Sequence, residues 1–206
     1  MPLQNRVDPF SKLHAVTNHG LFLGNRGILH NDQGELETDR WRTPAWIICT
    51  LTPPKSVTPH KLMTPGKYTH LFFMDEATAL AAGHRPCAYC RRDAWNTYRA
   101  ALNDENGPPM ASDIKDQLFG EMREYILKFG SKPRPAIRVA ELPDGAMFAI
   151  EHQAYLKWNA HAHPWSFSGY GAPESLPETA IALTPKLNRL ALANGYTPAL
   201  HSSLQT

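Results

Sequence analysis

Two cysteines separated by two residues, Cys87 and Cys90, constrain this chain more than any other short feature of its sequence. The spacing predicts a tight turn on which both sulfur atoms face one centre, and two such thiolates can ligate one Zn²⁺ ion at about 2.3 Å each. Arg85, Arg91 and Arg92 flank the pair, and their positive charge favours the thiolate form. The sequence therefore predicts one half of a zinc site.

The remaining ligands of this site have to come from other parts of the chain. The third cysteine, Cys49, lies in a β-branched and aromatic stretch at 45–51 that predicts a strand, from which the chain can fold back to the pair. The fourth ligand is expected to be a histidine, with His60, His70 and His84 as candidates and a water molecule as the remaining alternative. His84 is near the pair in sequence, whereas His60 lies in a proline-rich loop that a bound metal would order.

Two other interpretations of the cysteine pair are open: reduced structural thiols without a metal, and a redox pair. A redox pair is expected between a strand and a long helix, whereas this pair follows a short predicted helix that ends at Gly83. Zinc deaminases also contain Pro-Cys-x-x-Cys, but their catalytic half is His-x-Glu or Cys-x-Glu, and neither tripeptide occurs in this sequence. The sequence therefore favours a zinc site and argues against a deaminase.

The cysteine pair ends a longer motif. Phe72 and Phe73 precede an alanine-rich stretch, which leads into Ala-Gly-His-Arg-Pro-Cys-x-x-Cys. This pattern over 72–90 resembles the second half of the Ada-type cysteine-zinc module, a domain of bacterial methylphosphotriester repair proteins that is also appended to some nucleases. The resemblance covers about 20 of the 206 residues, and the first cysteine pair of the family is absent.

An ungapped placement of the family pattern puts Ser56 and His60 at the positions of the missing cysteines. The resemblance therefore implies that His60 replaces one cysteine ligand, which makes it the preferred fourth ligand. Because the methyl-accepting nucleophile of the family belongs to the missing pair, phosphotriester repair is not implied. The resemblance implies a zinc-stabilised scaffold and, as its furthest extension, association with DNA. Together with the positive charge of Arg85, Arg91 and Arg92 around the motif, it predicts a protein that contacts nucleic acid, DNA or RNA, through these arginines.

The pattern of apolar residues predicts an α+β fold. An apolar residue at every fourth position predicts an amphipathic helix over 112–129. This repeat consists of Ile114, Leu118, Met122 and Ile126. Short β-rich stretches on both sides of the helix predict a mostly antiparallel sheet, expected to be single and continuous, with the helix packed on it and the cysteine turn at its edge. The chain 1–206 is then one domain with a soft boundary near 130–136.

A second candidate site lies within 152–170. It contains His152, His161 and His163, the last two on the same face of an extended chain, and the aromatic side chains of a predicted long loop at 158–177. Such residues can bind a metal or a phosphate, or transfer protons in a small-molecule enzyme with a histidine and aromatic pocket. This enzyme is the alternative to the zinc-binding function. The structural interpretation is that the aromatic rings cover the sheet.

Composition limits the class of protein further. The 21 Lys and Arg residues against 19 Asp and Glu give a formal net charge of +2, far from the strongly basic balance that by itself indicates nucleic-acid binding. Three cysteines make a poor disulfide framework, which favours a reducing compartment. The sequence contains no stretch that predicts a membrane span or a secretory signal. We therefore expect a cytoplasmic zinc-binding protein.

Overall fold

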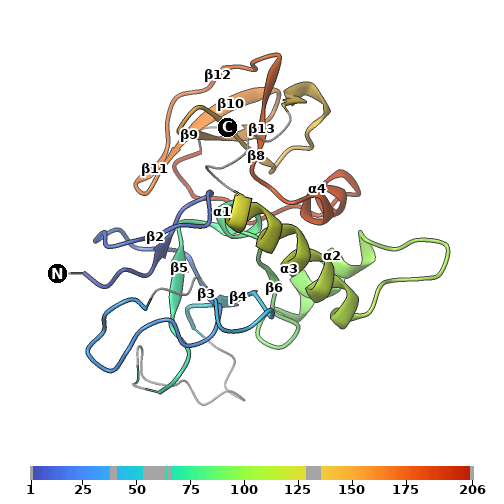
Figure 1. The fold of residues 1–206 in the computed structure, drawn as a ribbon. Helices are drawn as coiled ribbons and strands as arrows, with labels where there is room; N and C mark the ends of the chain where they lie inside the picture. Colours follow the sequence, from blue (N-terminus) through green and yellow to red (C-terminus); the bar gives the residue numbers. More distant parts are fainter. Residues whose placement is uncertain (1, 38–40, 53–63, 65, 129–135, 205–206) are drawn as a thin grey trace.

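The computed structural model describes residues 2–37, 41–52, 64, 66–128 and 136–204. Within these ranges the chain forms two mostly antiparallel sheets and four α-helices, one sheet lying above the other in Figure 1. The predicted α+β class is confirmed. The prediction of a single continuous sheet is wrong, because helix α1 (Glu76–Ala81) lies between two separate sheets and contacts β5 of one and β8 of the other.

The first sheet is built from the N-terminal part of the chain. The order of its strands is β2 (Leu13–His14), β1 (Arg6–Val7), β5 (Leu71–Phe73), β3 (Phe22–Asn25), β4 (Ile47–Thr50) and β6 (Arg85–Pro86). The pairs β1–β5 and β4–β6 are parallel, and the other pairs are antiparallel. Strand β6 lies at the edge of this sheet, so the cysteine turn that follows it also lies at a sheet edge.

The second sheet is built from the C-terminal part and is antiparallel throughout. The order of its strands is β11 (Gly169–Tyr170), β10 (His161–Ser166), β9 (Gln153–Trp158), β8 (Met147–Ile150), β13 (Thr179–Ala182) and β7 (Ile137–Arg138), and β12 (Glu174–Ser175) pairs with β10. The predicted long loop at 158–177 is therefore wrong. The β9–β10 hairpin turns at Asn159 and Ala160, whose φ angles are 49° and 59°. An Asn-Gly pair at these two positions would have predicted the hairpin turn from the sequence.

Helix α1 has the local signals that the sequence contains for it. The side chain of Asp75 accepts a hydrogen bond from the backbone N–H of Thr78 at 2.9 Å, which caps the first turn. Gly83, with φ of +86°, takes the left-handed conformation that ends the segment. Because these interactions are local, this helix could be predicted without knowledge of the sheets.

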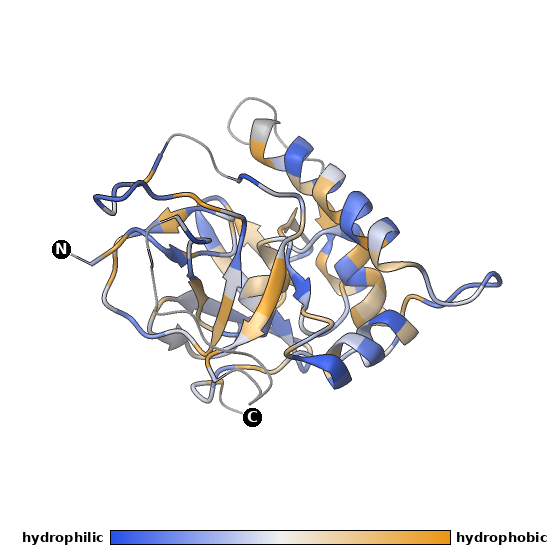
Figure 2. Ribbon diagram, turned by 90° about the horizontal axis from the view of Figure 1, so that it is seen from below, coloured by the Kyte–Doolittle hydropathy of each residue, from blue (hydrophilic) through white to orange (hydrophobic). Residues whose placement is uncertain are grey.

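Helix α3 (Ala111–Lys128) is the predicted amphipathic helix, and it begins one residue earlier than expected. The four residues of its apolar repeat are at most 5% exposed. It lies beside α4 (Lys186–Ala193), and α2 (Arg92–Ala100) follows the cysteine turn. The helix ribbons in Figure 2 alternate between hydrophobic and hydrophilic segments, as expected for helices with one buried face.

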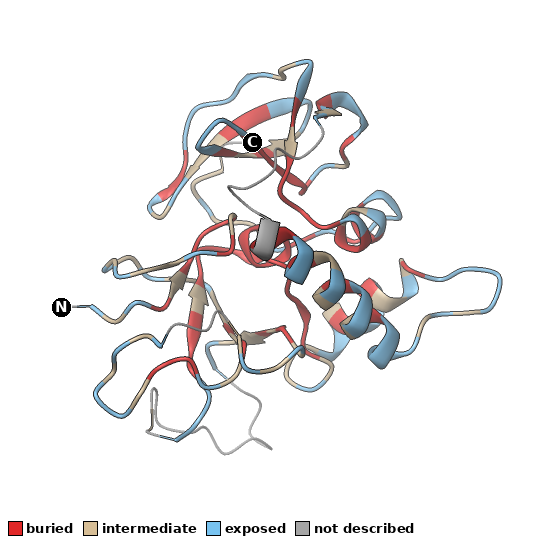
Figure 3. Cartoon of the chain, in the orientation of Figure 1, coloured by how far each residue is buried: buried red, intermediate tan, exposed pale blue. Residues whose placement is uncertain are grey.

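The hydrophobic core is shared by the two sheets. One cluster of buried side chains contains Phe73 of β5, Leu80 of α1, Ile114 of α3 and Phe148 of β8. Figure 3 shows the buried residues concentrated around α1 and along the strands that face it. The predicted soft boundary at 130–136 falls almost wholly outside the described residues.

Candidate metal centre

Two parallel neighbours in the first sheet, β4 and β6, bring the first two cysteines together. Their register pairs Ile48 with Pro86, so Cys49 and Cys87 occupy the next pair of positions. The backbone N–H of Cys87 donates to the carbonyl of Ile48 at 3.0 Å and fixes this register. Because Ile48 is fully buried and side chains alternate along a strand, Cys49 faces the other side of the sheet.

The chain turns back directly after Cys87. The N–H of Arg91 donates to the carbonyl of Cys87 at 3.1 Å, which closes one turn and returns Cys90 toward Cys87. The sulfur atoms of Cys49, Cys87 and Cys90 all lie within 4.8 Å of one another. Cys87 is buried and the other two are half-buried. The structure thus gathers the three predicted cysteine ligands at one point.

The hydrogen bonds of this thiol cluster converge on the sulfur of Cys87. The pKa of Cys87 is lowered because the thiols of Cys49 and Cys90 hydrogen-bond to its sulfur, and the backbone N–H groups of Cys90 and Tyr89 act in the same direction. The pKa of Cys49 is raised, chiefly by its hydrogen bond to Cys87. A divalent cation would replace the shared S–H protons with positive charge, so the same arrangement favours thiolates around a metal.

The cluster is compatible with a metal site in donor type and in size. Thiolate sulfur is a soft donor that suits zinc. Ligands at about 2.3 Å from zinc in a tetrahedron lie about 3.8 Å apart. Sulfur atoms within 4.8 Å of one another therefore reach this geometry with shifts of about 1 Å or less. Three sulfur ligands leave one position for a fourth ligand.

His84, a candidate for this position, is held elsewhere. Its ring is fully buried between Trp46 and Phe73, with ring centroids 5.4 and 4.6 Å away. Its Nε2 accepts a hydrogen bond from Nε of Arg26 at 3.4 Å. The pKa of His84 lies well below its usual range, because burial and then the charge of Arg26 disfavour the protonated ring. The structure therefore does not bring His84 to the thiols, because the core and a buried arginine hold its ring.

The other two histidine candidates have different outcomes. His60 lies outside the described residues, so its role as the fourth ligand stays a prediction. His70 is buried, and its ring lies 4.8 Å from the ring of Tyr68. Over the ranges that the structure describes, the group of clustered metal-binding side chains consists of the three cysteines alone.

The three arginines near the cysteine pair have unlike environments. Arg85 is buried, and its guanidinium lies over the ring of Trp95, 4.4 Å from the centroid. Arg91 directs both terminal nitrogens to the carboxylate of Glu76. Arg92 is exposed at the start of α2. Two of the three predicted nucleic-acid contacts therefore face into the protein, because each has an internal partner.

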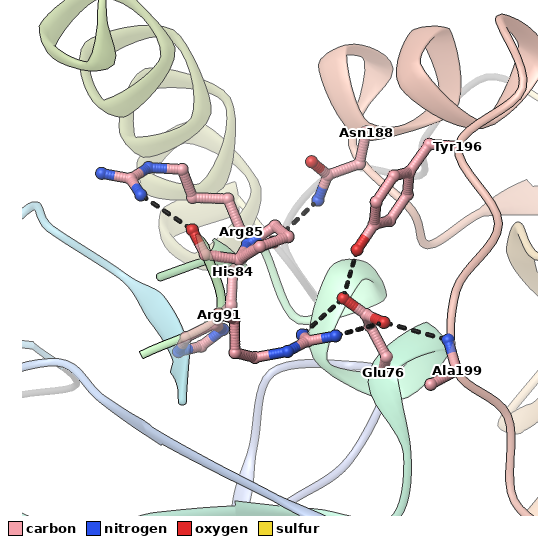
Figure 4. A network of polar contacts seen from close by, with 8 residues as sticks. Glu76, His84, Arg85, Arg91, Asn188, Tyr196 and Ala199 are labelled. Atoms are coloured by element: carbon pink, nitrogen blue, oxygen red, sulfur yellow. Dashed lines mark hydrogen bonds and ion pairs between the residues drawn. The ribbon is translucent and has the colours of Figure 1, made fainter. Parts of the chain in front are cut away.

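Glu76 joins the cysteine turn to the C-terminal part of the chain, and sequence reasoning missed it. Its carboxylate, 1% exposed, accepts hydrogen bonds from Arg91 at 2.6 and 2.9 Å, from the hydroxyl of Tyr196 at 2.5 Å and from the N–H of Ala199 at 2.9 Å (Figure 4). A glutamate in the first turn of a helix usually lies in solvent, where its charge interacts favourably with the helix dipole. No local signal indicates a partner 120 residues away.

The histidines of the second candidate site do not form a common centre. His152 and His161 are exposed, whereas His163 is buried. The rings of His161 and His163 lie 6.4 Å apart. Two pockets, one lined by parts of 3–34 and 64–69 and one by parts of 121–122 and 182–189, include no residue of 152–170. A catalytic role for these histidines stays a prediction.

The aromatic side chains of the same segment have a structural role. The indole N–H of Trp165 donates to the hydroxyl of Thr78 at 3.0 Å. The hydroxyl of Tyr170 donates to the carboxylate of Asp75 at 2.7 Å. Both partners lie at the start of α1. These rings therefore attach the second sheet to the central helix.

The fold and the thiol cluster together define an α+β protein with a three-cysteine site at a sheet edge. Comparisons of the chain with models of known protein families, with curated proteins and with solved structures gave no match. The resemblance of 72–90 to the Ada-type module therefore rests on its sequence pattern. Within the described ranges, no helix has both the length and the apolar character needed to cross a membrane.

Proposed function

We propose that this chain is a zinc-binding protein in which Cys49, Cys87 and Cys90 hold one structural zinc ion. The observation that carries the proposal is the meeting of three thiols, one from strand β4 and two from the turn that follows the neighbouring strand β6. The chain contains three cysteines in all, and cysteines that serve only as small apolar residues have no reason to converge. His60 is the proposed fourth ligand, on the ground of the Ada-like pattern.

The position of the cluster supports a structural role for the metal. Strand β6 has two residues, and the backbone N–H groups that hold this segment to β4 are those of Arg85, which donates to Trp46 at 3.3 Å, and of Cys87, which donates to Ile48 at 3.0 Å. Its attachment to β4 therefore depends on few backbone hydrogen bonds. A zinc ion that joins Cys49 to the turn after β6 reinforces this edge, so metal binding contributes directly to the free energy of folding. Free thiols also persist best in a reducing compartment, which supports a cytoplasmic location.

Metal analysis and thermal unfolding test this proposal. We expect about one zinc ion per chain and a lower melting temperature in a strong chelator, because an ion bound only by the native state stabilises that state. Cys87→Ser should lose the zinc. His161→Ala, which changes an exposed histidine outside the cluster, should keep it. Zinc content well under one per chain, with an unchanged melting curve in chelator, contradicts the proposal.

The fourth ligand is tested by a matched pair of histidine variants. We expect His60→Ala to reduce zinc retention during dialysis against a weak chelator. His84→Gln should retain the ion, because glutamine keeps a hydrogen-bond acceptor for Arg26 and its side chain stays in the core. Loss of zinc in His84→Gln with full retention in His60→Ala would reverse this assignment.

Association with DNA or RNA is a proposed extension of the zinc-binding function. Two exposed side chains at the cysteine turn support it: Tyr89, 57% exposed between the cysteines, and Arg92, the first residue of α2. An exposed ring can stack on unpaired bases, and a guanidinium can contact phosphate. In fluorescence anisotropy we expect binding that weakens with salt and that Arg92→Gln reduces more than Arg123→Gln on α3. If no DNA or RNA binds in a salt-dependent way, the extension fails and the zinc site stands.

A further inference from the structure

The thiol cluster contains every cysteine of the chain. Cys49, Cys87 and Cys90 are the three cysteines of the sequence, and all of them are free. Their sulfur atoms lie within 4.8 Å of one another. Oxidation of two thiols gives a disulfide, so three neighbouring thiols can form one disulfide and leave one thiol beside it. A reaction other than metal binding is therefore open to this cluster.

The backbone places Cys49 and Cys87 at a spacing that suits a disulfide. They occupy the pair of positions after Ile48 and Pro86 on the parallel neighbours β4 and β6, which lie side by side in Figure 1. Neighbouring strands are about 4.7–4.9 Å apart, within the roughly 4.4–6.8 Å between Cα atoms that a disulfide requires. Rotation about the two Cα–Cβ bonds can then bring the sulfur atoms to about 2.05 Å.

The alternative disulfide, between Cys87 and Cys90, stabilises the fold less. A cross-link stabilises a folded chain more when it closes a longer segment. A bond between Cys49 and Cys87 closes the segment 49–87, whereas a bond between Cys87 and Cys90 closes only the turn. The cross-strand bond also joins β4 to the end of β6, where few backbone hydrogen bonds hold the edge of the sheet.

The third thiol allows the disulfide to reach its best pairing. The backbone N–H of Thr50 donates to the sulfur of Cys90, which holds this sulfur beside the strand of Cys49. A free thiol next to a disulfide exchanges with it through a mixed disulfide. Whichever thiol reacts first with an oxidant, exchange within the cluster can therefore lead to the pair Cys49 and Cys87.

Small oxidants can reach the cluster. Cys49 and Cys90 are half-buried, and β6 lies at the edge of the first sheet. Hydrogen peroxide can transfer one oxygen to the thiol of Cys49, which becomes a sulfenic acid while the other oxygen leaves as water. The sulfur of Cys87 then attacks this sulfur, the S–S bond forms, and a second water leaves. The two thiols lose two electrons and two protons, and the peroxide is reduced to two water molecules.

We propose that the thiol cluster is a site of reversible oxidation, at which hydrogen peroxide joins Cys49 to Cys87 in a disulfide. Disulfides in a reducing compartment are usually transient and catalytic or redox-sensing. Where zinc is bound, the solvent supplies the two protons, and the ion is released because a disulfide sulfur is not the thiolate that zinc requires. This release rests on the proposed zinc-binding function, whereas the disulfide itself does not.

Peroxide treatment of the full chain, zinc-loaded and metal-free, tests the proposal. After alkylation of free thiols, we expect one disulfide and one alkylated cysteine per chain. Chymotrypsin cleaves after Tyr89 and separates Cys87 from Cys90, so mass spectrometry of the unreduced digest should find the Cys49 peptide linked to the Cys87 peptide. A colorimetric chelator should detect the loss of zinc in step with the disulfide. Dithiothreitol with added zinc should restore the thiols and the ion.

Two cysteine variants and a melting experiment complete the test. Cys90→Ser keeps both partners and should still form the cross-link, whereas Cys87→Ser should lose it. The peptide map of the unmodified sequence gives an answer even where a variant fails to fold. The melting temperature of the oxidised chain should be the same with and without chelator, because no ion is left to remove.

Three results would overturn the inference: thiols that stay reduced in peroxide, a main linkage that joins Cys90 to either other cysteine, or oxidation to sulfinic and sulfonic acids without a disulfide. The two proposals fail separately. A chain that binds zinc but forms no such disulfide retains the zinc-binding function alone. A chain that contains no zinc but links Cys49 to Cys87 retains the oxidation site alone.

Discussion

The buried ion pair of Glu76 and Arg91 offers the most direct test of how the cysteine turn is attached to the fold. Their side chains are 1% and 10% exposed. Glu76→Gln keeps the shape of the side chain but removes the charge that compensates Arg91. Breaking a buried pair by removing one partner costs about 3–5 kcal/mol, because the other charge stays buried without compensation. For a chain of this size, that corresponds to a fall in melting temperature of about 6–20 °C.

Urea and thermal unfolding of the full chain measure this effect. The matched control is Glu141→Gln, because the ion pair of Glu141 with Arg138 has side chains 68% and 71% exposed and should contribute about 0–1 kcal/mol. Adding Arg91→Met to Glu76→Gln removes the uncompensated cation and should recover part of the lost stability. The reasoning is refuted if Glu76→Gln unfolds within about 1 kcal/mol of the control, or if the second substitution lowers the stability further.

Three further predictions concern the metal, a buried histidine and a glycine. In thermal unfolding, Cys87→Ser and a chelator should lower the melting temperature by amounts that do not add, because both remove the same ion. From pH 7 to pH 5 the free energy of unfolding of the metal-free protein should fall, since the unfolded chain takes up a proton near pH 6.5 that folded His84, with its lowered pKa, does not. His84→Gln should reduce this slope, by an amount that approaches about 1.4 kcal/mol per pH unit at about one unit below pH 6.5. Gly83→Ala should lower the free energy of unfolding measured in urea by about 2–5 kcal/mol, because φ is +86° and the added Cβ would lie 2.3 Å from Cγ of Met122. In the Gly83→Ala background, Met122→Ala should relieve this clash.

The parts of the fold that could be predicted depend on local chemistry. Asp75 caps α1 through a residue three positions away, and Gly83 ends the segment through its own φ angle. The buried face of α3 follows from the spacing of its apolar residues alone. Each of these features needs no information from a distant part of the chain.

The division into two sheets could not be predicted because it depends on distant pairings. Strand β13 pairs with both β7 and β8, so a strand from further along the chain lies between two strands that follow each other in the sequence. The composition of β10, which contains His161 and His163, did not predict a strand, and the dipeptide Asn159-Ala160 did not predict a hairpin turn. The pairing of these strands with their neighbours, rather than the intrinsic strand propensity of their residues, determines the secondary structure of this region.

The candidate site shows the same difference between local and distant information. The cysteine pair and the strand of Cys49 could be predicted, because residue type and spacing indicate thiolate ligands. The exclusion of His84 could not, since it depends on the buried Arg26 against which its ring lies. Nor could the role of Arg91, because its partner Glu76 is a helix-start residue that usually lies in solvent.

The dipeptide Asp75-Glu76 connects the parts of the molecule that the sequence separates most widely. Asp75 accepts hydrogen bonds from the hydroxyl of Tyr170 in the second sheet and from the N–H of His201, while Glu76 binds Arg91 on the cysteine turn. Burial raises the pKa of Asp75 against the effect of these hydrogen bonds, so the arrangement costs free energy that a solvated helix start would not. Two adjacent buried carboxylates are stable only where their partners are held in place. The start of α1 therefore determines how the cysteine turn, the second sheet and the C-terminal segment are placed relative to one another.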